Sequence, residues 1–250
     1  MKILVTGSKG FIGKNLTAEL RNQGYTDIYC FDRDTDENLL DEYAKDCDFV
    51  FHLAGVNRPE NEKEFMEGNV EFTSKLLDVL KEHNNTCPIM ISSSIQAQLD
   101  NPYGKSKKAG EDLLFAYGQE TGAKVLVYRF PNVFGKWCRP NYNSVIATFC
   151  HNIARDLPIK VNNREAVLNL VYIDDVVEEL INALEGRETK NGAFCTVPVV
   201  HTITLGKIAD LIYSFKQSRE ERSIPDMSDS FTKKLYSTYL SYLPEDQFSY

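Results

Sequence analysis

Short apolar runs alternate with longer amphipathic stretches through the first half of the chain. The short runs predict strands, and stretches whose apolar residues recur every three or four positions predict helices. The expected strands are residues 2–6, 27–31, 49–53, 89–92 and 124–128, and the expected helices are residues 11–23, 62–84 and 103–120. Strands separated by helices favour right-handed crossovers, so we expect an α/β fold with a doubly wound parallel sheet of the Rossmann type.

After about residue 129 this rhythm loosens. Helices are expected at residues 144–155, 174–184 and 205–216, with Asp174 as an N-cap, and a strand at residues 167–171. The aromatic stretch 236–250 shows neither helical nor alternating periodicity, and we expect it to pack against something else. We therefore expect an NAD(P)-binding Rossmann domain over residues 1–130 and a smaller C-terminal substrate-binding lobe over residues 131–250, with some exchange of elements between them.

Composition narrows the class of protein. The chain has 250 residues, 42% of them hydrophobic and 26% charged, as in ordinary globular proteins. Its net charge of −8 argues against binding to nucleic acid or an anionic membrane. Six cysteines without a C-x-x-C pair and four scattered histidines predict no metal site. With no signal peptide and no apolar run of spanning length, we expect a cytoplasmic location.

Three glycines, Gly7, Gly10 and Gly13, lie where the first strand meets the first helix. Glycine there permits a tight turn, close backbone approach to a pyrophosphate and close packing of helix on sheet, while the helix N-terminus offers N–H donors. This turn predicts a bound dinucleotide. The residues expected to hold it are Gly7, Ser8, Lys9, Gly10, Phe11, Ile12 and Gly13.

Two residues at the end of the second strand give opposite signals about the cofactor. An acidic residue there binds the ribose hydroxyls of NAD, whereas an arginine accepts the 2′-phosphate of NADP. Asp32 and Arg33 are both present. Lys9 adds a positive charge and favours NADP, but these residues alone leave the choice open.

A serine run and a Tyr-x-x-x-Lys pair follow. Ser92 to Ser94 end the fourth strand, and Tyr103 and Lys107 lie four residues apart, on one face of the next helix. A nearby ammonium favours the phenolate of a tyrosine, and a serine hydroxyl can hold a carbonyl oxygen while hydride is transferred. This combination predicts a carbonyl reduction or oxidation site.

Together these segments resemble the extended short-chain dehydrogenase/reductase superfamily of nucleotide-sugar enzymes. The resemblance is carried by residues 6–13 (TGSKGFIG), 52–55 (HLAG), 69–70 (NV), 92–94 (SSS), 102–107 (PYGKSK), 129–135 (RFPNVFG) and 172–176 (YIDDV). Residues 52–59, 92–103, 135–150 and 235–250 further resemble the reductase half of bifunctional capsular-polysaccharide enzymes. In that family a C-terminal cupin domain epimerises a UDP-4-keto-6-deoxy-N-acetylhexosamine at C3, so a cupin is expected beyond this chain.

The resemblance implies roles for individual residues. Tyr103 would donate the proton to O4, Lys107 would hold the nicotinamide ribose and lower the tyrosine pKa, and Ser94 would bind the ketone oxygen. Further cofactor contacts are implied at Leu53, Ala54, Gly55, Asn69, Ser92, Phe130 and Val133, and substrate contacts at Arg58 and Asn132. The implied cofactor is NADPH, with NADH as the alternative, and a homodimer is the expected assembly.

Two departures from the superfamily pattern leave alternatives open. Ser94 and Tyr103 are unusually close in sequence, so Ser93 remains a rival for the serine role. Where many relatives carry a phosphate-binding arginine, this chain has Leu168 and Asn169, so Lys136, Arg139 and Arg164 become the candidates for binding the substrate phosphates.

The expected function is an NADPH-dependent reduction of the C4 ketone of a UDP-4-keto-6-deoxy-N-acetylhexosamine. The product would be UDP-N-acetyl-6-deoxy-L-talosamine, on the route to UDP-N-acetyl-L-fucosamine in capsular or O-antigen polysaccharide. A dehydratase would need a carboxylate pair beside the serine, where Ile95 and Gln96 stand. An NAD-dependent nucleotide-sugar epimerase and a non-catalytic NADP sensor remain the alternatives.

Overall fold

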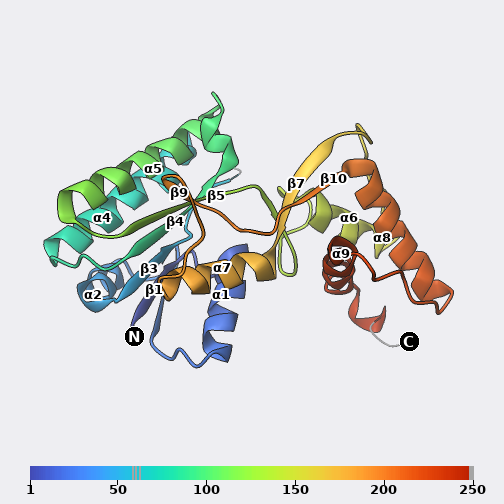
Figure 1. The fold of residues 1–250 in the computed structure, drawn as a ribbon, viewed down its shortest axis with the longest axis horizontal. Coiled ribbons are helices and arrows are strands. Elements are labelled where there is room, and N and C mark those ends of the chain that lie inside the picture. Colours follow the sequence, from blue (N-terminus) through green and yellow to red (C-terminus); the bar gives the residue numbers. More distant parts are fainter. Residues whose placement is uncertain (58, 60, 62, 248–250) are drawn as a thin grey trace. The chain divides into compact units, whose positions relative to one another are not determined.

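The computed structural model describes residues 1–57, 59, 61 and 63–247, and its chain divides into two compact units (Figure 1). Unit 1 contains Met1–Phe130 and Val177–Val197. Unit 2 contains Pro131–Val176 and Pro198–Tyr250. The chain thus leaves unit 1 after residue 130 and returns to it for residues 177–197.

Unit 1 is built on one seven-stranded sheet with the order β2-β1-β3-β4-β5-β9-β8. Its strands are β1 (Ile3–Thr6), β2 (Ile28–Phe31), β3 (Phe49–His52), β4 (Ile89–Ser94), β5 (Val125–Phe130), β8 (Lys190–Asn191) and β9 (Phe194–Cys195). All pairs are parallel except β8 with β9. The predicted doubly wound sheet is confirmed, and its strand order reverses direction between β1 and β3, where such folds bind ligands.

Helices cover both faces of this sheet. On one face lie α2 (Asn38–Asp46), α4 (Phe72–Glu82) and α5 (Pro102–Thr121), and on the other lie α1 (Phe11–Asn22) and α7 (Ile173–Leu184) (Figure 1). Short α3 (Lys63–Met66) and a π-helical segment η1 (Glu67–Glu71) precede α4, and a 3₁₀ turn η2 (Ile95–Gln98) follows β4. The core beneath α2, α4 and α5 includes Leu40, Leu76, Leu80 and Leu114.

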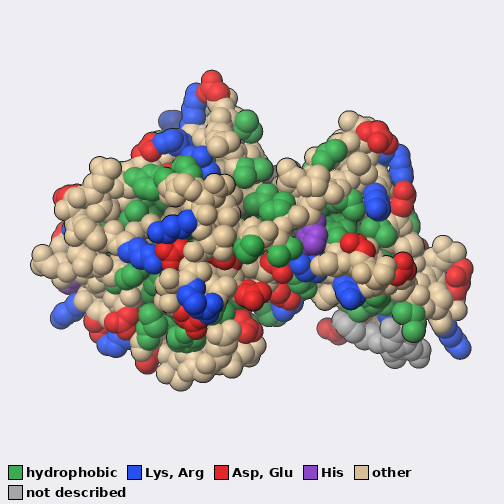
Figure 2. Space-filling view, in the orientation of Figure 1, with side chains coloured by type: hydrophobic (Ala, Val, Ile, Leu, Met, Phe, Trp, Pro, Cys, Tyr) green, Lys and Arg blue, Asp and Glu red, His purple; other side chains and the backbone are tan. Residues whose placement is uncertain are grey.

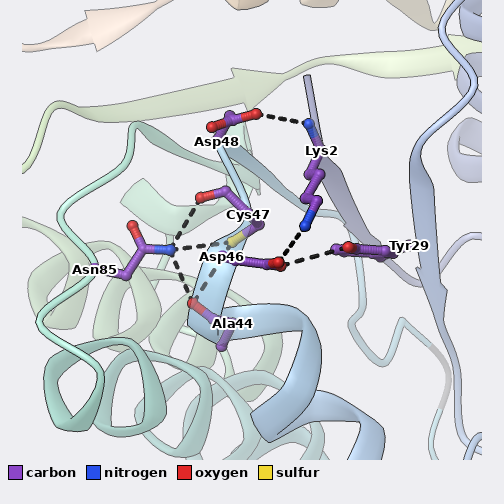
Figure 3. A network of polar contacts seen from close by, with 7 residues as sticks. All are labelled: Lys2, Tyr29, Ala44, Asp46, Cys47, Asp48 and Asn85. Atoms are coloured by element: carbon purple, nitrogen blue, oxygen red, sulfur yellow. Dashed lines mark hydrogen bonds and ion pairs between the residues drawn. The ribbon is translucent and has the colours of Figure 1, made fainter.

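A polar network secures the amino-terminal edge of the sheet, away from the strand ends that bind ligands (Figure 3). The backbone N–H of Lys2 donates to Asp48 at 2.7 Å, and its ammonium pairs with Asp46. The Asn85 amide donates to the carbonyls of Ala44 at 2.8 Å and Cys47 at 2.9 Å. These bonds satisfy carbonyls at the end of α2 that have no helical partner, so this edge contributes to stability.

Unit 2 has a small sheet of its own with the order β10-β7-β6. Its strands are β6 (Asn132–Phe134), β7 (Val167–Tyr172) and β10 (His201–Thr204), and its helices are α6 (Val145–Ile153), α8 (Leu205–Glu220) and α9 (Ser230–Leu240), with a 3₁₀ turn η3 (Glu245–Gln247). β6 and β7 are parallel, whereas β7 and β10 are antiparallel. The two units are thus built on separate sheets, which are mostly parallel in unit 1 and mixed in unit 2.

Several sequence predictions about elements were wrong. The segment with no expected periodicity begins inside α9, where Phe231, Leu235 and Tyr239 are buried four residues apart; a window starting at 236 misses two of them. Helix α7 begins at Ile173, so Asp174 lies in its first turn instead of capping it. Helix α2 was not predicted, because Leu40 and Ala44 are its only two buried positions.

Charged side chains of both signs are interspersed over the face of the molecule shown in Figure 2. Within the described ranges no helix is long and apolar enough to cross a membrane. The same ranges contain no cluster of three or more His, Cys, Asp or Glu side chains able to hold a metal ion.

Candidate cofactor and active site

The glycine-rich turn after β1 is packed so tightly that side chains cannot be added to it. Gly7 has a left-handed backbone (φ +70°), and a Cβ there would lie 2.7 Å from the Ala54 nitrogen. A Cβ on Gly13 would lie 2.2 Å from the Gly7 carbonyl oxygen. Helix α1 therefore starts directly against the turn, with Gly10 as an N-cap that makes no side-chain hydrogen bond. Its first N–H groups are left for an anionic ligand.

Asp32 forms the rim of this turn. Its carboxylate accepts hydrogen bonds from the Ser8 hydroxyl and, at 3.1 Å, from the Lys9 backbone N–H. The Lys9 ammonium pairs with Asp34 in an exposed ion pair. Arg33 is exposed and forms no ion pair with any described residue. Asp32, which favours NAD, and Arg33, which favours NADP, thus both lie at the rim of the turn. The Asp32 carboxylate is fixed by hydrogen bonds from the turn, whereas the Arg33 guanidinium has no ion-pair partner among the described residues.

The loop after β3 is held by Asn69, which lies in the π-helical segment η1. Its side-chain oxygen accepts from the Val56 N–H at 2.8 Å, and its amide donates to the Val56 carbonyl and the Ser106 hydroxyl, both at 3.0 Å. These bonds use the amide's capacity, so Asn69 shapes the loop of Leu53, Ala54 and Gly55. Its predicted direct contact with the cofactor stays a prediction.

His52 links the ends of β1 and β3 to α4 through a directed chain of hydrogen bonds. Thr73 donates its hydroxyl hydrogen to the Asn69 carbonyl, so it must accept from His52 Nε2–H at 2.8 Å. His52 Nδ1 then accepts from the Thr6 hydroxyl at 2.7 Å, and the Thr6 oxygen accepts from the Ala54 N–H. Burial and the nearby Lys107 lower the pKa of His52 to about 3, so the ring is neutral.

Helix α5 begins with a strong local start signal. The Asn101 side chain accepts from the Gly104 N–H at 2.7 Å, and Pro102 occupies the first turn. A Cβ on Gly104 would lie 2.3 Å from the Gln96 carbonyl, so glycine lets the helix start directly against η2. This compact turn explains how Ser94 and Tyr103 meet although only eight residues separate them.

Ser94, Tyr103 and Lys107 come together at the carboxyl end of β4. The Ser94 hydroxyl lies close enough to the Tyr103 phenol to lower its pKa, and the Lys107 ammonium donates to the Ser92 carbonyl at 3.1 Å. The Lys107 ammonium lies 5.9 Å from the centre of the Tyr103 ring. A Cβ on Gly55 would lie 3.0 Å from the same ammonium. The lysine therefore lies between the tyrosine and the loop after β3.

Burial sets the charge states of this group. It raises the pKa of Tyr103, although Ser94 acts to lower it, and it lowers the pKa of Lys107 to about 8, although Glu111 acts to raise it. Desolvation therefore outweighs the effect of Ser94, and the lowering of the tyrosine pKa by Lys107 stays a prediction. The phenol is protonated at neutral pH, as a proton donor requires.

Sequence reasoning missed a buried group directly behind these residues. Glu111 is fully buried and accepts from the Ser93 hydroxyl at 2.6 Å and from two nitrogens of Arg129 at 2.8 and 2.6 Å. The Arg129 guanidinium lies 3.7 Å from the centre of the Phe194 ring. The available signal was the four-residue spacing, which continues from Tyr103 and Lys107 to Glu111.

The predicted substrate residues of unit 2 differ in their surroundings. Asn132 is exposed at the start of β6, and Val133 pairs with Val171. Lys136 lies 3.6 Å from Asp174. Arg139 is exposed and its guanidinium lies over the Tyr142 ring at 5.2 Å.

Arg164 differs from the other two cations because it forms a short ion pair with Asp210 of α8, at 2.6 Å. A role in phosphate binding would require it to leave that partner. Arg58 lies outside the described residues. Phe130 ends β5 and pairs in register with Ser94, so it belongs to the same edge of the unit 1 sheet.

The turn and the loops of unit 1 fit a dinucleotide cofactor. The cradle has no room for Cβ atoms, offers the uncapped N–H groups of α1 and has a carboxylate at its rim. It lies after β1, next to the loop after β3, at the reversal point of the sheet. Lys107 and Tyr103 lie on α5, the helix that follows β4, and β4 is the neighbour of β3 in the sheet.

Known proteins share both the sequence and this architecture. The family model described as "NAD dependent epimerase/dehydratase family" matches residues 3–194. The whole chain is 46% identical to UDP-2-acetamido-2,6-beta-L-arabino-hexul-4-ose reductase of Pseudomonas aeruginosa and covers 67% of that protein. The crystal structure of the capsular polysaccharide assembling protein CapF from Staphylococcus aureus matches with a TM-score of 0.93 and 52% identity, over 100% of this chain and 68% of that one.

A more distant structure shows the same fold. UDP-glucuronic acid 4-epimerase from Bacillus cereus, solved in complex with NAD, matches 97% of this chain and 96% of its own with a TM-score of 0.77 at 21% identity. The chain thus spans about two thirds of the length of its more similar relatives and nearly all of this epimerase.

Proposed function

The chain belongs to the NAD dependent epimerase/dehydratase family and is an NAD(P)-dependent oxidoreductase, and from this premise we propose that it reduces the C4 ketone of a UDP-4-keto-6-deoxy-N-acetylhexosamine. One observation carries the proposal: the Ser94 hydroxyl lies beside the protonated Tyr103 phenol and acts on its pKa, with Lys107 one helical turn further along α5. Two adjacent hydroxyl groups of this kind suit a carbonyl oxygen that gains negative charge. The whole-chain similarity to a hexulose reductase supports the direction of reduction.

In this proposal the chain's own residues manage the proton and the charge. The Ser94 hydroxyl holds the ketone oxygen, and Tyr103 donates its phenol proton to O4 as the carbonyl becomes an alcohol. A reduced nicotinamide, when bound, supplies the hydride. Lys107 binds the ribose and offsets the negative charge that forms on the tyrosine oxygen.

We assign NADPH as the preferred cofactor. Arg33 supports this choice, because its exposed guanidinium has no ion-pair partner among the described residues and stands beside the cradle. Asp32 is the opposing feature, but its carboxylate is already engaged by Ser8 and the Lys9 N–H. A carboxylate that already accepts hydrogen bonds from the turn has fewer free lone pairs with which to accept the ribose hydroxyls of NAD.

For the substrate, we assign the pyrophosphate to Arg139 and Lys136 in unit 2, with Asn132 contributing an amide. Arg139 is favoured among the three predicted cations because it is exposed and forms no ion pair with a described residue, whereas Lys136 and Arg164 lie against carboxylates. A planar guanidinium also suits two phosphate oxygens at once. The names of the relatives support a UDP-sugar as the ligand class.

The direct test uses the protein with NADPH and UDP-2-acetamido-2,6-β-L-arabino-hexul-4-ose, the sugar named in the similar reductase. The amount of NADPH consumed, measured by the loss of its absorbance, should equal the amount of alcohol formed. Product formed without net loss of NADPH would show an epimerase instead. Cofactor binding without turnover of any UDP-ketose would favour the alternative function, a non-catalytic NADP sensor.

A further inference from the structure

Three consecutive serines of β4 each contact a successive turn of one face of α5. The Ser94 hydroxyl lies beside the Tyr103 phenol and lowers its pKa, the Ser92 carbonyl accepts from Lys107 at 3.1 Å, and the Ser93 hydroxyl donates to Glu111 at 2.6 Å. The helix residues are spaced by four and therefore lie above one another. Tyr103 and Lys107 thus make two of these three contacts between α5 and the serines of β4, and Glu111 makes the third.

The third contact is the most buried and the most strongly bonded. Glu111 has no exposed surface, and both of its oxygens are engaged by Arg129, whose side chain is 14% exposed. Arg129 is the register partner of Ser93 on β5, so one carboxylate joins β4, β5 and α5. Two parallel N–H···O bonds of an arginine fix direction as well as distance.

Glu111 also acts on the charge of its neighbour in the helix. Burial favours the neutral form of the Lys107 amine, and the Glu111 carboxylate opposes that effect. The other ionisable groups around Lys107 are the protonated Tyr103 on its own helix and the neutral His52 on β3. Arg129 faces Glu111 and neutralises part of its charge. Glu111 is therefore the negative group that favours an ammonium at position 107.

We propose that Glu111 is a positioning residue of the reductase site, whose carboxylate keeps Lys107 charged and holds the Tyr103–Lys107 face of α5 against β4. The turnover part of its test rests on the proposed function, whereas the titration of Lys107 does not. Glu111 contacts neither reacting atoms nor cofactor in this role. It acts through Lys107 and through the serine run.

The test replaces Glu111 with Gln, which keeps the size of the side chain and removes its charge. We expect the alkaline limit of the pH profile of kcat/KM, set by Lys107 near pH 8, to move down by about one unit. The kcat/KM at pH 8 should then fall about fivefold while its value at pH 6 changes little. Glu111→Asp should restore the alkaline limit, because it keeps the charge.

Asp112→Asn is the matched control, since this neighbouring carboxylate is exposed and pairs with Lys108. It should leave the pH profile unchanged. A Glu111→Gln variant whose activity falls equally at every pH would reduce Glu111 to a structural residue and overturn the proposal.

A second measurement is independent of turnover. The Lys107 amine can be titrated by NMR in protein carrying ¹³C-labelled lysine, with Lys107→Arg to assign the signal, and Glu111→Gln should lower its midpoint. An unchanged midpoint would contradict the inference whatever the protein catalyses. If Glu111→Gln does not fold, the double variant Glu111→Gln/Arg129→Gln avoids an unpaired buried cation, and the same lowering is expected. If the Lys107 titration midpoint of the double variant equals that of the wild type, the proposal is equally overturned.

Discussion

The Ser93 hydroxyl donates a 2.6 Å hydrogen bond to the buried carboxylate of Glu111. Ser94, the next residue, instead lies beside the Tyr103 phenol and lowers its pKa. The sequence left these two serines as rivals for the same role. Their different partners support Ser94 as the group that holds the ketone oxygen and Ser93 as part of the support beneath it.

Replacing each serine with alanine should therefore give different defects. We expect Ser94→Ala to lower kcat by roughly 10²- to 10³-fold, because a donor to the developing oxyanion is lost. Ser93→Ala should instead lower the free energy of unfolding by about 1–3 kcal/mol, because Glu111 loses a buried donor. Steady-state kinetics and urea denaturation of both variants check this, and a larger kcat loss in Ser93→Ala would reverse the assignment.

Tyr103→Phe tests the proton donor. Removing the phenol oxygen should lower kcat by about 10²- to 10⁴-fold while NADPH still binds, since the cradle lies on other residues. Tyr213→Phe, an exposed position on α8, is the control and should behave as the wild type. Reduced-cofactor absorbance measures the first effect and a fluorescence titration with NADPH measures the second. Nearly intact turnover in Tyr103→Phe would remove Tyr103 from the mechanism.

The parts of this protein that follow a short-range pattern were predictable. The glycine turn, the apolar runs of β3 and β4 and the four-residue spacing of Tyr103 and Lys107 are each visible within one or two turns of chain, and the structure has the expected sheet and helix there. Helix α9 was missed because its buried face is read only when Phe231 is included with Leu235 and Tyr239.

The supporting residues were not predictable for a different reason. Glu111 and Arg129 are charged, and charged side chains ordinarily lie in solvent. Their burial follows from the pairing of β4 with β5 and the packing of α5, which join residues 93, 111 and 129. Likewise, the helix predicted at 62–84 is divided into α3, the π-helical η1 and α4. Asn69 lies in η1 and hydrogen-bonds to Val56, a tertiary contact that the periodicity of the sequence does not reveal.

Arg33→Ser tests the cofactor assignment. If the guanidinium binds the 2′-phosphate, this change should weaken NADPH binding roughly tenfold or more and leave NADH binding unchanged, because NADH lacks that phosphate. Arg21→Ser, at the exposed last turn of α1, is the control for general loss of positive charge. Titrations with both cofactors at fixed ionic strength decide the matter. Equal weakening of both cofactors would contradict a 2′-phosphate contact at Arg33.

His52 makes the stability of unit 1 dependent on pH. Its pKa is about 3 in the folded protein against 6.5 for an ordinary histidine, because burial and the nearby Lys107 disfavour the charged ring. The folded pKa is depressed, so this stabilisation is complete above about pH 6.5. It is lost as the pH falls towards 3, because the unfolded chain takes up a proton that the folded chain does not.

The loss expected from His52 alone over that range is about 3–5 kcal/mol. His52→Gln removes the titrating ring but keeps a donor and an acceptor, so its unfolding free energy should be lower at pH 7 and should fall less steeply between pH 6.5 and 4. His83→Gln, which replaces a histidine paired with Asp41 at the surface, should keep the wild-type slope. Urea denaturation at several pH values measures these slopes. An unchanged slope in His52→Gln would mean that other groups, such as the surface carboxylates, govern the acid sensitivity.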